Sequence, residues 1–174
     1  SSIGSSIPSN RMTEHFSEIR EAVARLCADF PGRYWRDKDR AREYPKEFVE
    51  ALSAAGYLAV LVPEQYGGSG LGVGAASAVL EEIHKSGCNG AACHAPMYTM
   101  GTLLKPGSEA QKREWLPRIA SGEAILTPAW LEPRRGFGPR GVQLRAEPAP
   151  GGFLLTGEKR HVPFASAATR LLGL

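Results

Sequence analysis

The sequence predicts an α+β chain with two parts, an all-α helical domain over residues 13–123 and the beginning of an antiparallel β domain over residues 124–174. In the first part apolar residues recur three or four positions apart, which is typical of amphipathic helices. After Gly122 apolar and polar residues alternate instead, which is typical of strands. Residues 1–12, which begin SSIGSSIPSN, are expected to be a disordered arm or a cloning remnant.

Composition and charge are those of an ordinary globular protein. Of the 174 residues, 43% are apolar and 22% are charged, and the net charge of +3 is too small to indicate nucleic-acid binding. No apolar run approaches the roughly 18–20 residues that cross a bilayer, so no membrane span is expected. The start lacks a basic segment followed by an apolar one, and the cysteines are scattered, so we expect a cytoplasmic protein with reduced thiols.

Three helices are predicted in the first half of the chain. The first covers residues 13–30 and ends before a Pro-Gly pair. A mixed-charge stretch over residues 33–43 follows and is expected to be a solvated surface. The second helix has Pro45 in its first turn and Gly56 as its C-terminal cap, and the third covers residues 73–86.

Two further helices are predicted ahead of the strands. Pro96 is expected to open a short apolar helix, since proline suits the first helical turn. A capping box, in which the side chains of Ser108 and Gln111 accept from each other's backbone N–H groups, starts the next helix. Pro117 should break or kink that helix, because it cannot donate a hydrogen bond to the carbonyl four residues earlier.

The β region is predicted as a hairpin followed by two short strands. Residues 142–147 and 153–156 form the hairpin, with a five-residue loop over residues 148–152. Further strands are expected at residues 160–162 and 171–174. Because so few strands leave unpaired edges, the sheet is expected to need more chain or another subunit to complete it.

Three segments of the sequence carry a resemblance to a known family. The first is GYLAVLVPEQYGGSGL at residues 56–71, and the second is GSEAQKREWLPRIASGE at residues 107–123. The third is LEP at residues 131–133 followed by LTGEK at residues 155–159. In their order and spacing these segments resemble the acyl-CoA dehydrogenase family, and the resemblance extends from about Thr13 to the last residue of the sequence.

The resemblance implies a fold and an activity. The family has an N-terminal helical domain, a middle β domain and a C-terminal four-helix bundle, and the bundle is absent from this chain. The implied protein is a flavoprotein oxidoreductase of fatty acid or lipid metabolism that uses FAD to dehydrogenate an acyl-CoA at its α,β bond. The base is a glutamate expected beyond this chain, so no catalytic residue is assigned and the chain alone is expected to be inactive. An electron-transfer acceptor and a homo- or hetero-oligomer are also implied.

The resemblance also implies which residues meet the cofactor, namely Trp130, Leu131, Phe137, His161 and Pro163. Leu131 stands where the family has a threonine whose hydroxyl faces the flavin, and Phe137 stands in place of a serine. His161 takes the position of a tryptophan beside the flavin, and Pro163, which lacks an N–H, takes that of a threonine. These changes leave an alternative open, a non-catalytic, flavin-poor partner subunit of an acyl-CoA dehydrogenase-like complex.

Three residues are predicted to bind the acyl-CoA substrate: Met97, Tyr98 and Met100. Methionine adapts to irregular apolar shapes, and the resemblance places this helix beside the acyl chain. The same spacing fits an ordinary helical core equally well, so both interpretations stay open.

A glycine-rich segment indicates a different chemistry. Residues 70–75 match the G-x-G-x-x-G/A nucleotide fingerprint, and residues 58–62 could be the strand before them, which would suit a nicotinamide-linked reductase. Seven residues separate the two segments, which is too many for that fingerprint. A turn that leads into the third helix is therefore favoured.

Three other polar groups have simple structural interpretations. Glu132 is expected to be a structural carboxylate rather than a base. A basic loop could meet the phosphates of CoA or FAD, although a solvated loop is favoured; it contains Arg134, Arg135 and Arg140. A cluster of possible zinc ligands lacks the paired spacing of a zinc site, so no metal is expected; it contains His84, Cys88, Cys93 and His94.

Overall fold

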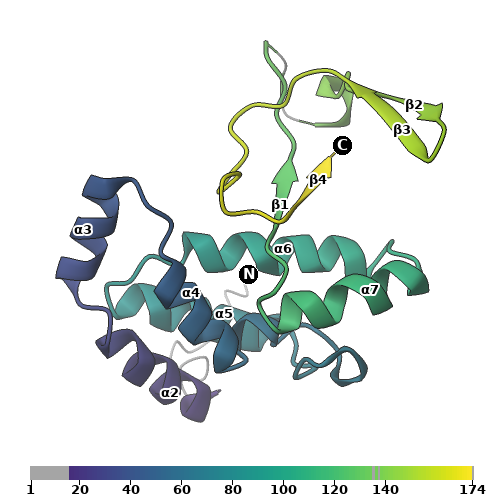
Figure 1. Cartoon of the computed structure of the whole chain (residues 1–174). Coiled ribbons are helices and arrows are strands. Elements are labelled where there is room, and N and C mark those ends of the chain that lie inside the picture. Colours follow the sequence, from purple (N-terminus) through teal and green to yellow (C-terminus); the bar gives the residue numbers. More distant parts are fainter. Residues whose placement is uncertain (1–15, 135, 137, 174) are drawn as a thin grey trace, which may run out of the picture.

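The computed structural model describes residues 16–134, 136 and 138–173, so the arm predicted over residues 1–12 lies outside the described part (Figure 1). Six α-helices come first in this part and short strands follow, which confirms the predicted order of the α+β chain. The helices are α2 (Ser17–Ala28), α3 (Gly32–Ala41), α4 (Lys46–Ala54), α5 (Val73–Lys85), α6 (Ala91–Leu104) and α7 (Glu109–Ala120).

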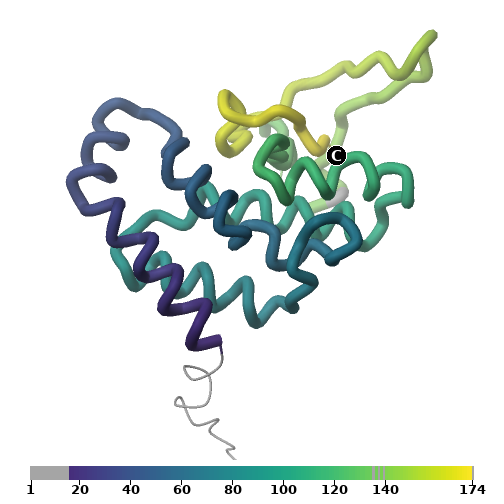
Figure 2. Tube along the Cα trace, turned by 60° about the horizontal axis from the view of Figure 1, so that its bottom comes forward, coloured from purple at the N-terminus to yellow at the C-terminus, as the bar shows by residue number. Residues whose placement is uncertain are grey.

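Four short strands form two separate sheets of two strands each among the described residues. They are β1 (Leu126–Ala129), β2 (Arg145–Ala149), β3 (Gly152–Thr156) and β4 (Arg170–Gly173). Strand β1 pairs in parallel with β4, with Leu126 opposite Arg170, and β2 pairs antiparallel with β3, with Ala149 opposite Gly152. The strands lie on one side of the helices, and the β2–β3 hairpin (yellow-green) projects away from them (Figures 1 and 2).

Helix α6 lies between two hydrophobic clusters and contributes to both. The first cluster gathers around Phe48, where α2, α4 and α5 meet, and α6 adds Cys93 and Met97. The second cluster gathers around Leu116 and joins α7 to β1, and α6 adds Met100. A helix that is buried on two sides needs apolar residues nearly all round, which explains the composition of α6.

Helix α6 begins at Ala91 and not at Pro96, which corrects the predicted start. The N-cap residue is Gly90, and the preceding Asn89 satisfies one N–H of the first turn, because its Oδ1 accepts a hydrogen bond from the Ala91 N–H at 2.9 Å. Pro96 therefore lies inside the helix, where it removes the hydrogen bond to the Ala92 carbonyl. The burial of α6 on two sides offsets this loss.

Helix α7 carries the predicted capping box. Ser108 Oγ accepts from the Gln111 N–H at 3.2 Å, and Gln111 Oε1 accepts from the Ser108 N–H at 2.9 Å. Pro117 was predicted to break or kink this helix. No break occurs, because the helix continues through Pro117 to Ala120. Its last turn buries Ile119 in the second cluster, and this packing outweighs the missing N–H.

Helix α3 covers the mixed-charge stretch that was expected only to be a solvated surface. It buries no residue completely, and its charged side chains face the solvent except that of Lys38, which is 18% exposed and pairs with Glu43 and Glu47. Two half-buried aromatic residues attach it to the core: the Trp35 ring packs edge-on against Phe48 at 4.9 Å between ring centres, and Tyr34 packs likewise against Phe30 at 5.1 Å. The indole N–H of Trp35 also donates to the Phe30 carbonyl at 3.0 Å.

Two predictions for the β region are wrong. The hairpin turns through two residues, Pro150 and Gly151, and not through five, because the left-handed φ of 81° at Gly151 permits a tight turn. Residues 160–162 form no strand, since His161 has a left-handed backbone with a φ of 52°. The strand predicted at residues 171–174 is present as β4, but its parallel pairing with β1 departs from the antiparallel expectation.

The glycine-rich turn before α5 gives a stability prediction. A Cβ at Gly68 would overlap the backbone carbonyl and the Cβ of Val62, whereas a Cβ at Gly72 would meet no atom within 4 Å. Gly68→Ala is therefore expected to lower the free energy of unfolding by about 1–3 kcal/mol, as overpacking does. Gly72→Ala is the matched control and should change it by less than about 1 kcal/mol. Urea unfolding of both variants measures the difference, and equal stabilities would contradict the close approach at Gly68.

Candidate functional site

The predicted cofactor residues come from two segments that the structure joins. Trp130 and Leu131 follow β1, and His161 and Pro163 lie in the loop that leads to β4. The Arg160 N–H donates to the Leu131 carbonyl at 2.7 Å, which holds the two segments side by side. Four of the five predicted residues therefore lie in one region of the molecule.

Glu132 anchors this region. Its carboxylate accepts hydrogen bonds from Lys159 Nζ at 2.8 Å and from the N–H groups of Gln143 and Leu144 at 2.8 and 2.9 Å. The Lys159 ammonium, followed by the backbone donors, lowers the pKa of Glu132 to about 2. Lys159 Nζ also donates to the Trp130 carbonyl at 3.3 Å. Glu132 thus joins the end of β1, the start of the hairpin and the segment after it, which fits a structural carboxylate.

The loop that carries His161 and Pro163 is held in a strained shape. His161 and Phe164 both have a left-handed φ of 52°, which costs roughly 1–3 kcal/mol for a residue with a side chain. Thr127 Oγ1 donates to the Pro163 carbonyl at 2.6 Å, and the Phe164 ring packs edge-on against Tyr44 at 5.6 Å between ring centres. These contacts with β1 and with the segment before α4 hold the loop in place.

The side chains of this region differ in what they offer to another molecule. The Leu131 side chain has no hydrogen-bonding group, and Pro163 has no N–H to donate. Trp130 is 45% exposed and His161 is also exposed, so both rings offer a stacking surface and an N–H group. The region therefore presents two exposed aromatic rings and has no hydroxyl group at Leu131 or Pro163. Phe137, the fifth predicted residue, lies outside the described residues.

The three predicted substrate residues do not face a common space. Met97 and Met100 are buried in the first and second clusters respectively. The Tyr98 side chain is 42% exposed on another side of α6, and its ring packs edge-on against His94 at 5.2 Å between ring centres. In this chain Tyr98 is the one of the three whose side chain is open to another molecule.

The glycine-rich segment is a turn that uses its own N–H groups. Residues 58–62, expected as a strand if a nucleotide were bound, form a short 3-10 turn and a bend instead. The N–H groups of Gly70 and Leu71 donate to the carbonyls of Val62 and Val60 at 2.8 and 2.7 Å. Because these donors are already paired within the turn, they are not directed at a phosphate.

The cysteines and the basic loop offer no assembled site among the residues that the structure describes. All three cysteines are buried, and burial raises the pKa values of Cys27 and Cys93 to about 12, so both thiols stay protonated. No group of three or more His, Cys, Asp or Glu side chains in the described ranges could hold a metal ion. Arg134 and Arg140 are exposed, and Arg135 lies outside the described residues.

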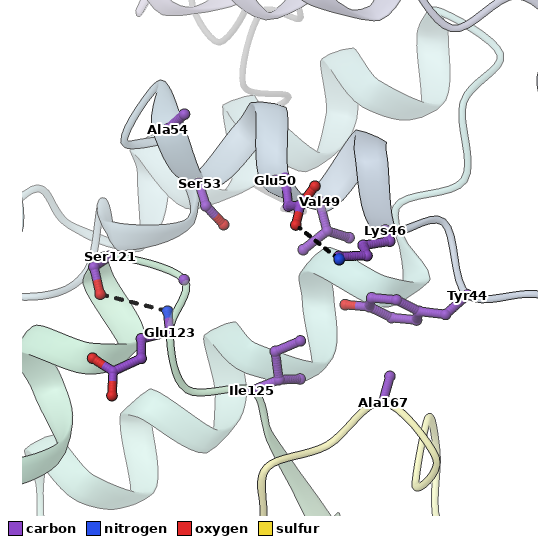
Figure 3. A pocket seen from close by; sticks show the side chains of 11 residues that line it. Tyr44, Lys46, Val49, Glu50, Ser53, Ala54, Ser121, Glu123, Ile125 and Ala167 are labelled. Carbon is purple, nitrogen blue, oxygen red and sulfur yellow. Dashed lines mark hydrogen bonds and ion pairs between the residues drawn. The ribbon is translucent and has the colours of Figure 1, made fainter.

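The structure also has a cavity of about 600 Å³ that the sequence did not indicate (Figure 3). It lies between α4, the turn after α7 and the loop before β4, at the start of β1. The predicted cofactor residues Trp130 and Leu131 follow the other end of that strand. The walls of the cavity come from segments that are far apart in the sequence, so no local pattern could have indicated it.

Comparison with known proteins identifies the family to which this chain belongs. The family model described as "Acyl-CoA dehydrogenase, N-terminal domain" matches residues 13–123. The chain therefore belongs to the acyl-CoA dehydrogenase family, as the three sequence segments indicated. No helix in the described part of the chain is long and apolar enough to cross a membrane.

Individual relatives are similar over most of this chain. It is 34% identical to the mitochondrial isovaleryl-CoA dehydrogenase of Pongo abelii, over 86% of this chain and 36% of that protein. An acyl-CoA dehydrogenase from Geobacillus kaustophilus has a TM-score of 0.80 and 21% identity, over 90% of this chain and 41% of that chain. A Tcur3481–Tcur3483 steroid ACAD has a TM-score of 0.73 and 27% identity, over 93% of this chain and 45% of that chain. The chain thus spans less than half the length of each.

Proposed function

We propose that this chain forms the helical wall and the first strands of the cofactor slot in a flavin-dependent acyl-CoA dehydrogenase. The observation that carries the proposal is the joining of the end of β1 to the loop at residues 160–163, which brings Trp130 and His161 into one region. FAD would supply the chemistry, as the acceptor of the hydride that leaves the β-carbon of an acyl-CoA. The glutamate that removes the α-proton is expected beyond this chain.

The residues of this chain would position the cofactor. The rings of Trp130 and His161 would stack against the flavin or donate to it, because both are exposed beside the end of β1. The Glu132–Lys159 ion pair, at 2.8 Å, would fix the backbone that carries Trp130 and Leu131. These roles are positioning and binding, and none of these residues would transfer a proton.

The helices would form the other wall of the slot. Tyr98 would border the acyl chain with its exposed side chain, whereas Met97 and Met100 would shape that wall from within the core. The whole protein would pass its electrons to an electron-transfer acceptor and work in the cytoplasm as a homo- or hetero-oligomer. The resemblance to the family supports these assignments, which extend to acyl-CoA as the substrate class.

A second function, a flavin-poor partner subunit, has specific observations in its favour. The Leu131 side chain and the Pro163 backbone offer no donor where the family has hydroxyl groups. The name of the similar steroid ACAD, Tcur3481–Tcur3483, joins two proteins, as the name of a complex of two different subunits would. In such a complex this chain would complete the fold while a partner binds the flavin.

The flavin content of the whole protein that contains this chain distinguishes the two functions. We expect it to bind FAD, and we expect His161→Ala to weaken that binding, because it removes a ring and a donor at the end of β1. His94→Ala, which changes an exposed histidine on α6, is the matched control and should bind FAD as the natural protein does. FAD bound only when a partner subunit is added would favour the second function. If the whole protein binds no FAD, either alone or with a partner subunit, the catalytic proposal is contradicted.

A further inference from the structure

The cavity at the start of β1 has three walls from distant parts of the chain. Helix α4 supplies Val49 and Ser53, the segment after α7 supplies Gly122 and Ile125, and the loop before β4 supplies Ala167 (Figure 3). Its volume of about 600 Å³ lies within the roughly 300–1,000 Å³ of typical small-molecule sites.

Close contacts define two sides of this cavity. Gly122 has a left-handed φ of 79°, and a Cβ there would lie 3.0 Å from the Ser53 side chain, so α4 and the turn after α7 approach closely. On another side the Tyr44 ring packs edge-on against Phe164, with 5.6 Å between ring centres. These contacts tie the cavity walls to the helices and to the loop that leads to β4.

The Tyr44 hydroxyl is the unusual group of the cavity. It is buried and has no hydrogen-bond partner among the described residues. Figure 3 shows the hydroxyl end of this ring directed into the space between Val49 and Ile125. A buried hydroxyl without a partner is costly, and such groups in folded proteins call for a partner that the protein itself does not supply.

The charges around the cavity are paired within the protein. Lys46 Nζ lies 3.5 Å from the Glu50 carboxylate, and Glu123 lies 3.6 Å from the Arg118 guanidinium. The deeper surface is apolar and includes Val49, which is almost fully buried. An occupant therefore meets apolar walls, the buried Tyr44 hydroxyl without a partner, the more accessible Ser53 hydroxyl, and no unpaired charge from these groups.

From these observations we propose that the cavity is a binding site for a small, neutral, mostly apolar molecule that carries one carbonyl or hydroxyl group. The apolar body would pack against Val49, Ile125 and Ala167, and the polar group would form a hydrogen bond with the Tyr44 hydroxyl. Burial of apolar surface would supply most of the affinity, and the hydrogen bond would supply the selectivity.

This site is separate from the proposed cofactor slot. Ile125 precedes β1 and Trp130 follows it, so the two sites lie at opposite ends of that strand. The cavity uses none of the residues assigned to FAD, and the inference holds whether or not the protein binds a flavin.

The probes are 1-indanone, which has a carbonyl, and indane, the hydrocarbon of the same shape without it. Two-dimensional NMR of the full 174-residue chain follows the backbone amide signals during titration with each probe. Both probes should shift the signals of Ser53, Gly122, Ile125 and Ala167. Tyr44→Phe should weaken the binding of 1-indanone by roughly two- to tenfold, the worth of one hydrogen bond, and leave that of indane unchanged.

Two controls keep this test decisive. Tyr57→Phe removes a hydroxyl that does not line the cavity and should leave both affinities unchanged. Ala167→Trp fills the cavity and should abolish the binding of both probes. The proposal is overturned if neither probe shifts these signals up to its solubility limit, or if Tyr44→Phe weakens both probes equally.

Discussion

Phe48→Ala is expected to lower the free energy of unfolding by about 3–5 kcal/mol, the usual cost of removing a large aromatic side chain from a core. Phe48 is fully buried on α4. Its ring packs edge-on against Phe30 and Trp35, at 5.1 and 4.9 Å between ring centres. The loss therefore combines a cavity in the first cluster with two broken aromatic contacts, one of which attaches α3.

Chemical denaturation of the natural chain and the variant measures this loss. Phe153→Ala is the matched control, because Phe153 is 68% exposed on the β2–β3 hairpin, and it should change the free energy of unfolding by no more than about 0.5 kcal/mol. A cost below about 1 kcal/mol for Phe48→Ala would show that α4 does not form the centre of the core.

Glu132→Gln is expected to destabilise the region around the end of β1 and to lower the midpoint of thermal unfolding by several degrees. The substitution removes the partner of Lys159, whose side chain is only 10% exposed, and weakens the acceptor for two backbone N–H groups. Glu158→Gln is the matched control, since its ion pair with Arg160 is exposed and should contribute almost nothing. Equal midpoints for the two variants would contradict the anchoring role of Glu132.

The pH dependence of stability gives a second readout of Glu132. Its pKa is lowered from 4.5 to about 2 in the folded chain, mainly by Lys159. A lowered pKa means that the contribution is present above pH 4.5 and is lost as the pH falls toward 2. Glu132→Gln should therefore flatten the stability profile in this window. Some slope should persist, because hydrogen bonds also lower the pKa of Glu47 to about 2. An unchanged profile would count against the buried ion pair.

Helices with a clear apolar period or a specific cap were predictable from the sequence. The third helix was expected over residues 73–86 and is observed as α5 (Val73–Lys85), and the capping box at Ser108 is present in α7. Helix α3 was not predicted, because this mostly charged helix has no continuous apolar face. Two aromatic residues attach it to the core. Pro96 and Pro117 do not interrupt their helices, since burial of α6 and α7 outweighs one missing hydrogen bond in each.

The candidate site was predictable only in part. The resemblance placed Trp130 and His161 in one site, and the structure lays their segments side by side. The three donors that fix Glu132 come from two other segments, so their arrangement depends on tertiary packing. The parallel pairing of β1 with β4 and the cavity beside Tyr44 also depend on residues far apart in the sequence, which no local period can reveal.

The most direct test of the proposed function is an anaerobic titration of the whole protein that contains this chain with acyl-CoA. Absorbance is recorded in the visible flavin band. If the chain forms one wall of a flavin-dependent dehydrogenase, added acyl-CoA should bleach this band, and Trp130→Ala should weaken both the flavin binding and the bleaching. A protein that carries FAD but shows no bleaching with short, long or branched acyl-CoA would contradict the proposed dehydrogenation.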